Sequence, residues 1–354
     1  STRTAPPLSP EPTGRSLLPP MGLPKTWQAL ARASATDVER VQARALVRQA
    51  RQEWPLIPHW REVLGRAGID PKKVRSLTDL DPIPALAVSQ LLRLDPTHLR
   101  PTPDPGRLKR FWPASRKLAL ALSGSNGGAM LQRGYAVAHV DRVPVGGGFV
   151  DIESTPHDAR LEGQQGARAL DVLGVAERDA RVVVGAVPGF LSRALTGGGS
   201  AARTAVETVA PEVESVLARI ADGNVDVLLA PRTAIEAVLE AGVGSLKVVA
   251  ATDGPTPREV RAAWHAKGVR AGDLAALPLA RLLLAEEPYD QDGPLGLAIS
   301  PDLVRIEPER GMALTHLAHR GTTLVRCTGV LPAGTYLPAG IPRRRRSLPR
   351  WLGE

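Results

Sequence analysis

The sequence predicts an α/β fold in which a helical N-terminal region precedes a core of mixed strands flanked by helices. From residue 181 onward, short β-branched runs alternate with segments whose apolar residues recur at helical spacing. The 34 Gly and 33 Pro residues fit many tight turns between short elements. Val304 and Ile306 alternate with polar residues, which predicts antiparallel strands near the C-terminus.

The core elements follow from their apolar patterns. The expected strands span 181–187, 225–229 and 246–251, and the expected helices span 211–221, 233–241 and 257–267. The apolar run at 118–122 is expected to be a short buried strand that leads into a glycine-rich loop at 123–128.

We divide the chain into four parts by composition. Residues 1–25 are rich in Pro, Ser and Thr without periodicity, which predicts a mobile leader. Residues 26–113 form the helical region, where Asp37 is the expected N-cap of the first long helix. Residues 114–330 form the α/β core, and residues 331–354 form a Pro- and Arg-rich basic tail.

Composition excludes several classes of protein. Cys327 is the one cysteine, so an intrachain disulfide and a multi-cysteine zinc site are excluded, and a reducing, cytoplasmic location is expected. The longest uncharged stretch, 327–342, contains three Pro and three Gly, so we expect no membrane-spanning helix. The N-terminus has no apolar segment typical of a secretory signal.

The formal charge of +9 is concentrated partly near the C-terminus. The residues that carry it there are Arg343, Arg344, Arg345, Arg346 and Arg350. We expect these arginines to contact an acidic protein partner, with a solvated tail and RNA binding as the alternatives. Aromatic residues are scarce and no other basic cluster stands out, so nucleic-acid binding is not favoured.

Several short segments follow one another in a recognisable order. They are WPLIPHW at 54–60, LGRAGID at 64–70, VRSLTDL at 74–80, SGSNGG at 123–128, VDVLLAP at 225–231, SLKVVAATDG at 245–254 and RCTGV at 326–330. This order resembles phenylacetate-CoA ligases and bacterial acyl-protein synthetases, which belong to the adenylate-forming superfamily. The resemblance covers about residues 45–330 and implies the large N-terminal domain of that superfamily, with a helical N-terminal subdomain.

The resemblance also implies a vestigial nucleotide cleft. The positions that match its motifs are Ser123, Gly124, Ser125, Asn126, Gly127, Gly128, Asp253 and Thr328. The loops after Leu122, Ala230 and Ala251 are expected to converge on one edge of the sheet, where ligands of α/β proteins bind. From the residues alone, the glycine-rich run also fits a tight turn, and Asp253 before a glycine also fits a turn former.

Four departures from the family pattern argue for lost ATP chemistry. Ala129 stands where the family loop has Lys, and Val330 stands where it has a ribose-binding Asp. The window 273–279 lacks the family's Tyr and its Mg²⁺-binding Glu. The given sequence stops 24 residues after Val330, so we expect no C-terminal lid domain.

Three classes of function therefore stay open. The leading hypothesis is a degenerate homologue without catalytic residues, metal or cofactor, acting as a binding or structural component of a larger assembly. The alternative is an active ATP-dependent acyl- or aryl-CoA ligase, or acyl-protein synthetase, that uses ATP and Mg²⁺ and is completed by a partner chain. The third is a basic nucleic-acid-associated protein. A small acyl or aryl molecule is the ligand that the resemblance implies.

Other candidate residues receive structural interpretations. His316 and His319 are expected to be a surface pair rather than metal ligands, and Cys327 a buried replacement for a family Tyr rather than an acyl acceptor. Glu286 and Glu287 are expected to be solvated loop carboxylates. The glycine runs at 146–148 and 197–199 are expected to be flexible loops.

Overall fold

The structure is a computed structural model whose described part has short gaps. It describes residues 23–102, 104–124, 127–175, 180–242, 245–288, 296–339 and 348–353. The expected leader therefore lies almost wholly outside the described residues, as do Ser125 and Asn126 of the glycine-rich run. The four consecutive arginines at 343–346 also lie outside them.

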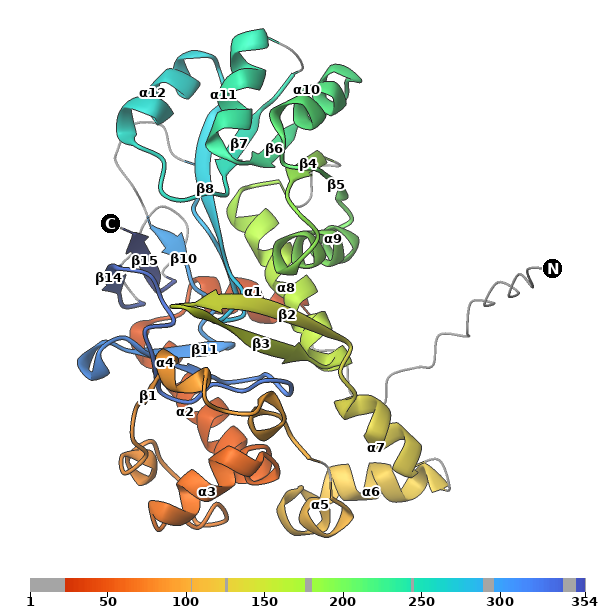
Figure 1. The fold of residues 1–354 in the computed structure, drawn as a ribbon, viewed down its shortest axis with the longest axis vertical. Coiled ribbons are helices and arrows are strands. Elements are labelled where there is room, and N and C mark those ends of the chain that lie inside the picture. The colour runs from red at the N-terminus through yellow and green to blue at the C-terminus, as the bar shows by residue number, and fades with distance from the viewer. Residues whose placement is uncertain are drawn as a thin grey trace, which may run out of the picture.

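Helices and strands alternate through most of the described chain (Figure 1). The helices are α1 (Leu23–Ala31), α2 (Ala35–Gln52), α3 (Pro58–Arg66), α4 (Val88–Leu91), α5 (Pro105–Phe111), α6 (Ala114–Leu122), α7 (Gly127–Tyr135), α8 (Pro156–Val172), α9 (Phe190–Ala202), α10 (Val213–Ala221), α11 (Arg232–Ala241) and α12 (Arg258–Ala266). The strands are β1 (Leu86–Ala87), β2 (His139–Val145), β3 (Gly148–Ser154), β4 (Arg181–Gly185), β5 (Ala205–Val209), β6 (Val227–Ala230), β7 (Val248–Ala251), β8 (Arg270–Leu277), β9 (Leu282–Ala285), β10 (Leu297–Ala298), β11 (Val304–Glu307), β12 (Ala313–His316), β13 (Cys327–Thr328), β14 (Gly334–Leu337) and β15 (Arg350–Gly353). None of the described helices is long and apolar enough to cross a membrane.

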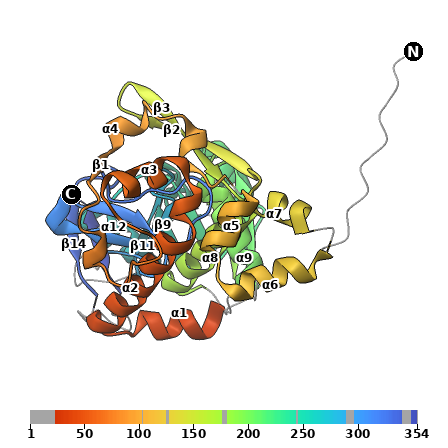
Figure 2. The same cartoon turned by 90° about the horizontal axis from the view of Figure 1, so that it is seen from below.

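The strands form three sheets, which confirms the predicted α/β class with mixed sheets. The largest has nine strands in the order β14-β15-β10-β9-β8-β7-β6-β4-β5. Strands β5, β4, β6, β7 and β8 run parallel to one another, whereas β9 is antiparallel to β8. Four strands, in the order β1-β13-β12-β11, form a second sheet. Strands β2 and β3 form a hairpin that lies beside α4 (Figure 2).

Helices cover both faces of the parallel strands. Alternate strand residues such as Val182 and Val184 pack with α8 and α9, whereas Val183 on the opposite face packs with α10, α11 and α12. Because both faces are covered, β4, β6 and β7 are almost continuously apolar, as expected of buried parallel strands. The observed strands and helices of this region lie within a few residues of the predicted ranges.

The helical N-terminal region shares its core with the four-stranded sheet. Trp54 and Trp60 are buried in one cluster with Leu314 and Leu324, and the Trp60 Nε1 donates to the Thr323 carbonyl oxygen at 2.7 Å. The first long helix, α2, begins at Ser34 rather than at the predicted N-cap Asp37. Asp37 instead occupies the third helical position, where its N–H donates to the Ser34 hydroxyl.

The prediction of a strand at 118–122 is wrong, because this segment is the end of α6. Its sequence, ASRKLALAL over 114–122, contains strong helix formers and no β-branched residue. Leu118 and Leu122 are 61% and 79% exposed, so the run is not a buried strand. Gly127 and Gly128 then begin α7. The glycine-rich run therefore joins two helices.

The prediction that 197–199 is a flexible loop is also wrong, because these glycines lie in α9 at its crossing with α8. A Cβ on Gly166 would lie 1.8 Å from the Ala194 carbonyl oxygen, and one on Gly198 would lie 2.3 Å from Gly166. Glycine is thus required on both helices for the backbones to approach this closely. By contrast, 146–148 does form the hairpin turn between β2 and β3.

The C-terminal segment is part of the large sheet rather than a separate tail. Strand β15 pairs with β14 and β10, and Leu348 and Trp351 are buried. Arg350, predicted to contact a partner, is 1% exposed, and its Nη1 donates to the Gly296 carbonyl oxygen at 3.1 Å. Composition misled here because Leu348 and Trp351, on either side of Arg350, supply apolar surface that packs in the core.

Candidate functional site

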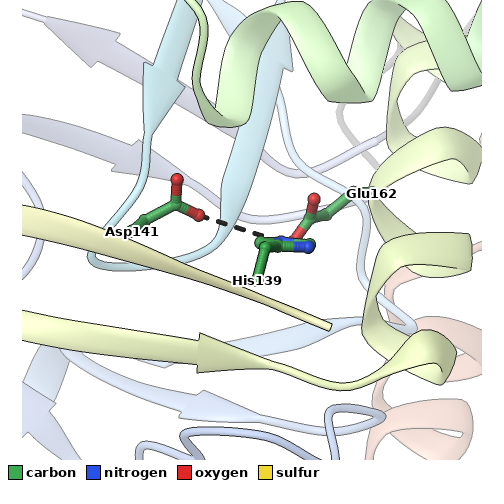
Figure 3. A group of neighbouring side chains, drawn as sticks. All are labelled: His139, Asp141 and Glu162. Carbon is green, nitrogen blue, oxygen red and sulfur yellow. Dashed lines mark hydrogen bonds and ion pairs between the residues drawn. The ribbon is translucent and has the colours of Figure 1, made fainter. Parts of the chain in front are cut away.

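Charged side chains converge where the β2–β3 hairpin meets α8 (Figure 3). The His139 Nε2 lies 3.0 Å from the Glu162 Oε1 and 4.0 Å from the Asp141 Oδ2. Glu162 is buried, whereas the side chains of His139 and Asp141 keep 18% and 13% of their surface exposed. These three residues form the hairpin cluster, which has a buried carboxylate at its base and two partly exposed groups at its mouth.

Local sequence explains why these side chains meet. His139 and Asp141 are two apart on β2, so both point to the same face of the hairpin. Asp158 and Glu162 are four apart on α8, so both lie on its buried face. Thr155 caps α8 and exchanges hydrogen bonds with Asp158, which fixes the start of the helix. These periodicities were visible in the sequence, but our sequence analysis did not identify the cluster.

Two arginines neutralise the acids of the hairpin cluster. The Arg193 Nη2 lies 2.5 Å from the Asp141 Oδ2, and its Nε lies 3.4 Å from the Glu162 Oε2. Arg281 is 1% exposed and reaches the Ser154 Oγ at 2.6 Å and the Glu162 Oε1 at 3.4 Å. Burial raises the pKa of Glu162, but the hydrogen bond from His139 and the charge of Arg281 outweigh it and hold the pKa below its usual value.

Asp158 is the most heavily bonded acid in this region. It accepts hydrogen bonds from the Thr155 N–H and hydroxyl and from the N–H groups of Arg320 and Gly321, at 2.6–2.8 Å. Burial opposes its ionisation, but the charge of Arg281 and these bonds hold its pKa well below the usual range. Asp158 is therefore ionised, and its carboxylate links the start of α8 to the loop before β13.

His316 and His319 are fully buried, so the prediction of a surface pair is wrong. Their ring centroids are 4.3 Å apart. His316 accepts the Leu324 N–H on Nδ1, so its Nε2 carries the proton and donates to the Ala280 carbonyl oxygen. Burial lowers the pKa of His316 to about 4 and that of His319 well below its usual value. Both rings are therefore neutral and act as packed core groups.

The hairpin cluster also has the side-chain types of a metal site. One ligand atom from each of His139, Asp141 and Glu162 lies within 4.8 Å of the other two. A divalent cation would have to compete with guanidinium groups, because Asp141 already pairs with Arg193 and Glu162 with Arg281. We therefore interpret the cluster as an ion-pair network that fastens the hairpin to α8 and α9.

The described residues of the predicted nucleotide cleft do not come together. Asp253 follows β7, and both of its carboxylate oxygens accept the Arg232 N–H at the start of α11, at 3.1 Å. Thr328 lies in β13, within the other large sheet. Gly124 falls between α6 and α7 in the chain. Figure 1 shows these two helices at the opposite end of the molecule from β7 and α11. The expected convergence of the glycine-rich run with the Asp253 turn is thus wrong, and the motif match at 123–128 fails with it.

Of the positions that depart from the motifs of the resemblance, Val330 is built into the core, whereas Ala129 is exposed. Val330 is 7% exposed and belongs to the same hydrophobic cluster as Cys327, as does Leu279 at the end of the window 273–279. Cys327 is fully buried, as predicted, and burial raises the pKa of its thiol to about 12. A thiol in this setting is not ionised near neutral pH.

Glu286 and Glu287 are buried, so the prediction that they are solvated loop carboxylates is wrong. The Arg261 Nη2 donates to the Glu286 Oε2 at 2.6 Å and also contacts the Asp273 carboxylate. Burial raises the pKa of Glu286 and of Asp273, and the single guanidinium between them only partly offsets it. This second network ties α12 to β8 and the end of β9.

Solved structures of 2-hydroxyisobutyryl-CoA ligase share this arrangement of elements. An open conformation in complex with 2-HIB-AMP and CoA has a TM-score of 0.63 and 15% identity, covering 91% of this chain and 70% of the ligase. The postadenylation state in complex with 2-HIB-AMP has a TM-score of 0.62 and 16% identity, covering 91% and 68%. No family model and no curated protein matches the sequence. The likeness confirms the adenylate-forming fold that the sequence predicted.

Proposed function

We propose that this chain, which has the large-domain fold of adenylate-forming ligases, does not activate carboxylic acids and instead serves as a binding or structural component of a larger assembly. One observation carries the proposal. Val330, which stands where the resemblance implies a ribose-binding acid, is packed in the hydrophobic core. That position therefore contributes packing rather than a nucleotide contact, and the window 273–279 offers neither the Tyr nor the Glu that the resemblance implies.

The chemistry explains why these replacements matter. Adenylate formation attacks the α-phosphate of ATP with a carboxylate, and the charge on the phosphates has to be neutralised in the transition state. Each preorganised charged contact contributes about 3 kcal/mol to such a step. Val330 supplies none of it, the window 273–279 has no Glu, and Ala129 is not a cation.

Carboxylate-dependent exchange of pyrophosphate into ATP tests this proposal. We expect exchange at background for a panel of aliphatic and aromatic acids, with 2-hydroxyisobutyryl-CoA ligase and its own acid as the positive control. Exchange above background with any acid would show that the chain is an active ligase.

For the assembly itself, we propose that Arg343, Arg344, Arg345 and Arg346 contact an acidic protein partner. Four adjacent arginines form a strong positive charge that acts over about 10 Å at moderate salt. Because 348–353 is part of the sheet, the test is substitution of all four by Ser rather than truncation. We expect the variant to unfold at the wild-type denaturant concentration and to lose salt-sensitive binding to an acidic partner. Unchanged binding would contradict the proposal.

A further inference from the structure

A cavity of about 490 Å³ that is open to solvent lies in the helical N-terminal region, between α3 and α5. Figure 1 shows these two helices at the same end of the molecule, away from the parallel strands. Its walls come from α3, from α5 and from the chain just after α3, including Ile69 and Pro71. The volume is in the range of small-molecule sites in proteins.

Three arginines line this cavity: Arg61 from α3, and Arg107 and Arg110 from α5. Within the described ranges, no carboxylate forms an ion pair with any of them. The Arg61 Nη1 is buried and has no hydrogen-bond partner in that part of the chain. Asp104 is the acid of the lining. Its carboxylate accepts the backbone N–H of Arg107 at 2.9 Å and so caps the first turn of α5. The lining therefore carries two net positive charges.

This arrangement is unfavourable without an anion. Burial and the neighbouring charge of Arg107 lower the pKa of Arg61, and Glu62 offsets that effect only in part. A buried N–H donor without an acceptor also costs free energy. An anion in the cavity would offset the repulsion between the guanidinium groups.

We propose that the cavity binds a small organic phosphate ester. A phosphate monoester carries nearly two negative charges at neutral pH, which matches the excess charge of the lining. Guanidinium groups present paired N–H donors that fit phosphate oxygens. Leu64, Ile69 and Phe111 supply an apolar wall for the organic part of the ligand. The lining shares no residue with the hairpin cluster or with the positions predicted to form a nucleotide cleft.

Calorimetric titration of the full chain with phenyl phosphate tests the proposal. We expect saturable binding at one site, weakened at least tenfold by Arg61→Gln and by Arg107→Gln, because each removes a charge-assisted contact. The matched control is Arg66→Gln, which removes an exposed arginine of the same helix outside the lining. It should change the affinity by less than about twofold, since a surface charge acts only through screened attraction. Denaturant unfolding of each variant shows that the fold is intact.

Other probes distinguish the class of ligand. Benzoate carries one charge on the same ring and should bind at least tenfold more weakly, and inorganic phosphate should also bind more weakly because it lacks the apolar part. Failure of phenyl phosphate to saturate, or equal weakening by Arg66→Gln, would overturn the proposal. Benzoate binding as tightly as phenyl phosphate would overturn the assignment to phosphate esters.

Discussion

Replacing Asp158 by Asn should destabilise the protein strongly while keeping the size of the side chain. The carboxylate accepts four hydrogen bonds from Thr155, Arg320 and Gly321, and its Oδ2 lies 3.5 Å from the Arg281 Nη1. An amide keeps one oxygen but directs its NH₂ group at a backbone N–H. It also removes one of the two acids that neutralise the buried Arg281.

The magnitude follows from these contacts. Removing one partner of a buried ion pair costs about 3–5 kcal/mol, because the other charge stays buried. We expect the free energy of unfolding to fall by about 4 kcal/mol at pH 7. The control is Asp151→Asn on β3, whose carboxylate is 46% exposed and lies 4.0 Å from the Arg142 Nε. That change should cost less than about 0.5 kcal/mol.

The pH dependence separates the effect of charge from that of shape. The pKa of Asp158 lies below its usual value of 3.8 in the folded state, so its contribution to stability is present above pH 3.8 and is lost as the pH falls further. Asn does not titrate. The difference between wild type and Asp158→Asn should therefore shrink as the pH is lowered through 4. Urea unfolding from pH 7 down to the lowest pH at which both proteins fold measures this difference.

A loss below about 1 kcal/mol at pH 7 would refute the reasoning, because it would mean that the carboxylate carries little of the native ion pairing. A difference that stays constant as the pH falls would show that shape rather than charge explains the loss.

Two further substitutions test the packing. Gly166→Ala should cost about 3 kcal/mol or prevent folding, because its Cβ would meet the Ala194 carbonyl oxygen at 1.8 Å. A Cβ on Gly134 would meet nothing within 4 Å, so Gly134→Ala should be neutral or slightly stabilising. Equal changes in the free energy of urea unfolding for the two variants would contradict the close contact of α8 with α9. Trp351→Ala should cost about 3–5 kcal/mol, because Trp351 is 2% exposed in the core. The control in the same assay is Leu122→Ala, because Leu122 is exposed. If Trp351→Ala lowers the free energy of unfolding no more than Leu122→Ala does, the C-terminal segment is a separate tail.

The parallel core was predictable because its signals are local. A strand covered on both faces is apolar throughout, and each helix that follows has an apolar stripe at its own period. Thus 181–187 was expected as a strand and β4 is Arg181–Gly185, and 257–267 was expected as a helix and α12 is Arg258–Ala266. The run at 118–122 failed because five apolar residues fit either a strand or the face of a helix.

The burial of charged residues could not be predicted, because their partners lie far away in the sequence. Glu286 is buried because Arg261, 25 residues earlier, reaches it from α12. The acid that holds the Arg320 loop is Asp158, 162 residues earlier. The local sequence therefore does not distinguish a solvated carboxylate next to a turn from a carboxylate that is buried against a distant guanidinium group. The hairpin cluster was missed for the same reason, although the alternation in β2 hinted at it.

The distribution of charge separates structural sites from a binding site in the described part of the chain. In the hairpin cluster and around Arg261, each buried acid contacts a guanidinium group, so releasing it for proton transfer would leave a buried charge unpaired. Such acids stabilise the fold, which agrees with the proposal that the chain is not a ligase. Around Arg61 the imbalance is reversed, because cations line a cavity without acids that pair with them. Unpaired cations lower the stability of a protein, and a bound ligand of opposite charge restores that stability. We therefore expect the ligand chemistry of this chain in the helical region rather than at the motif positions.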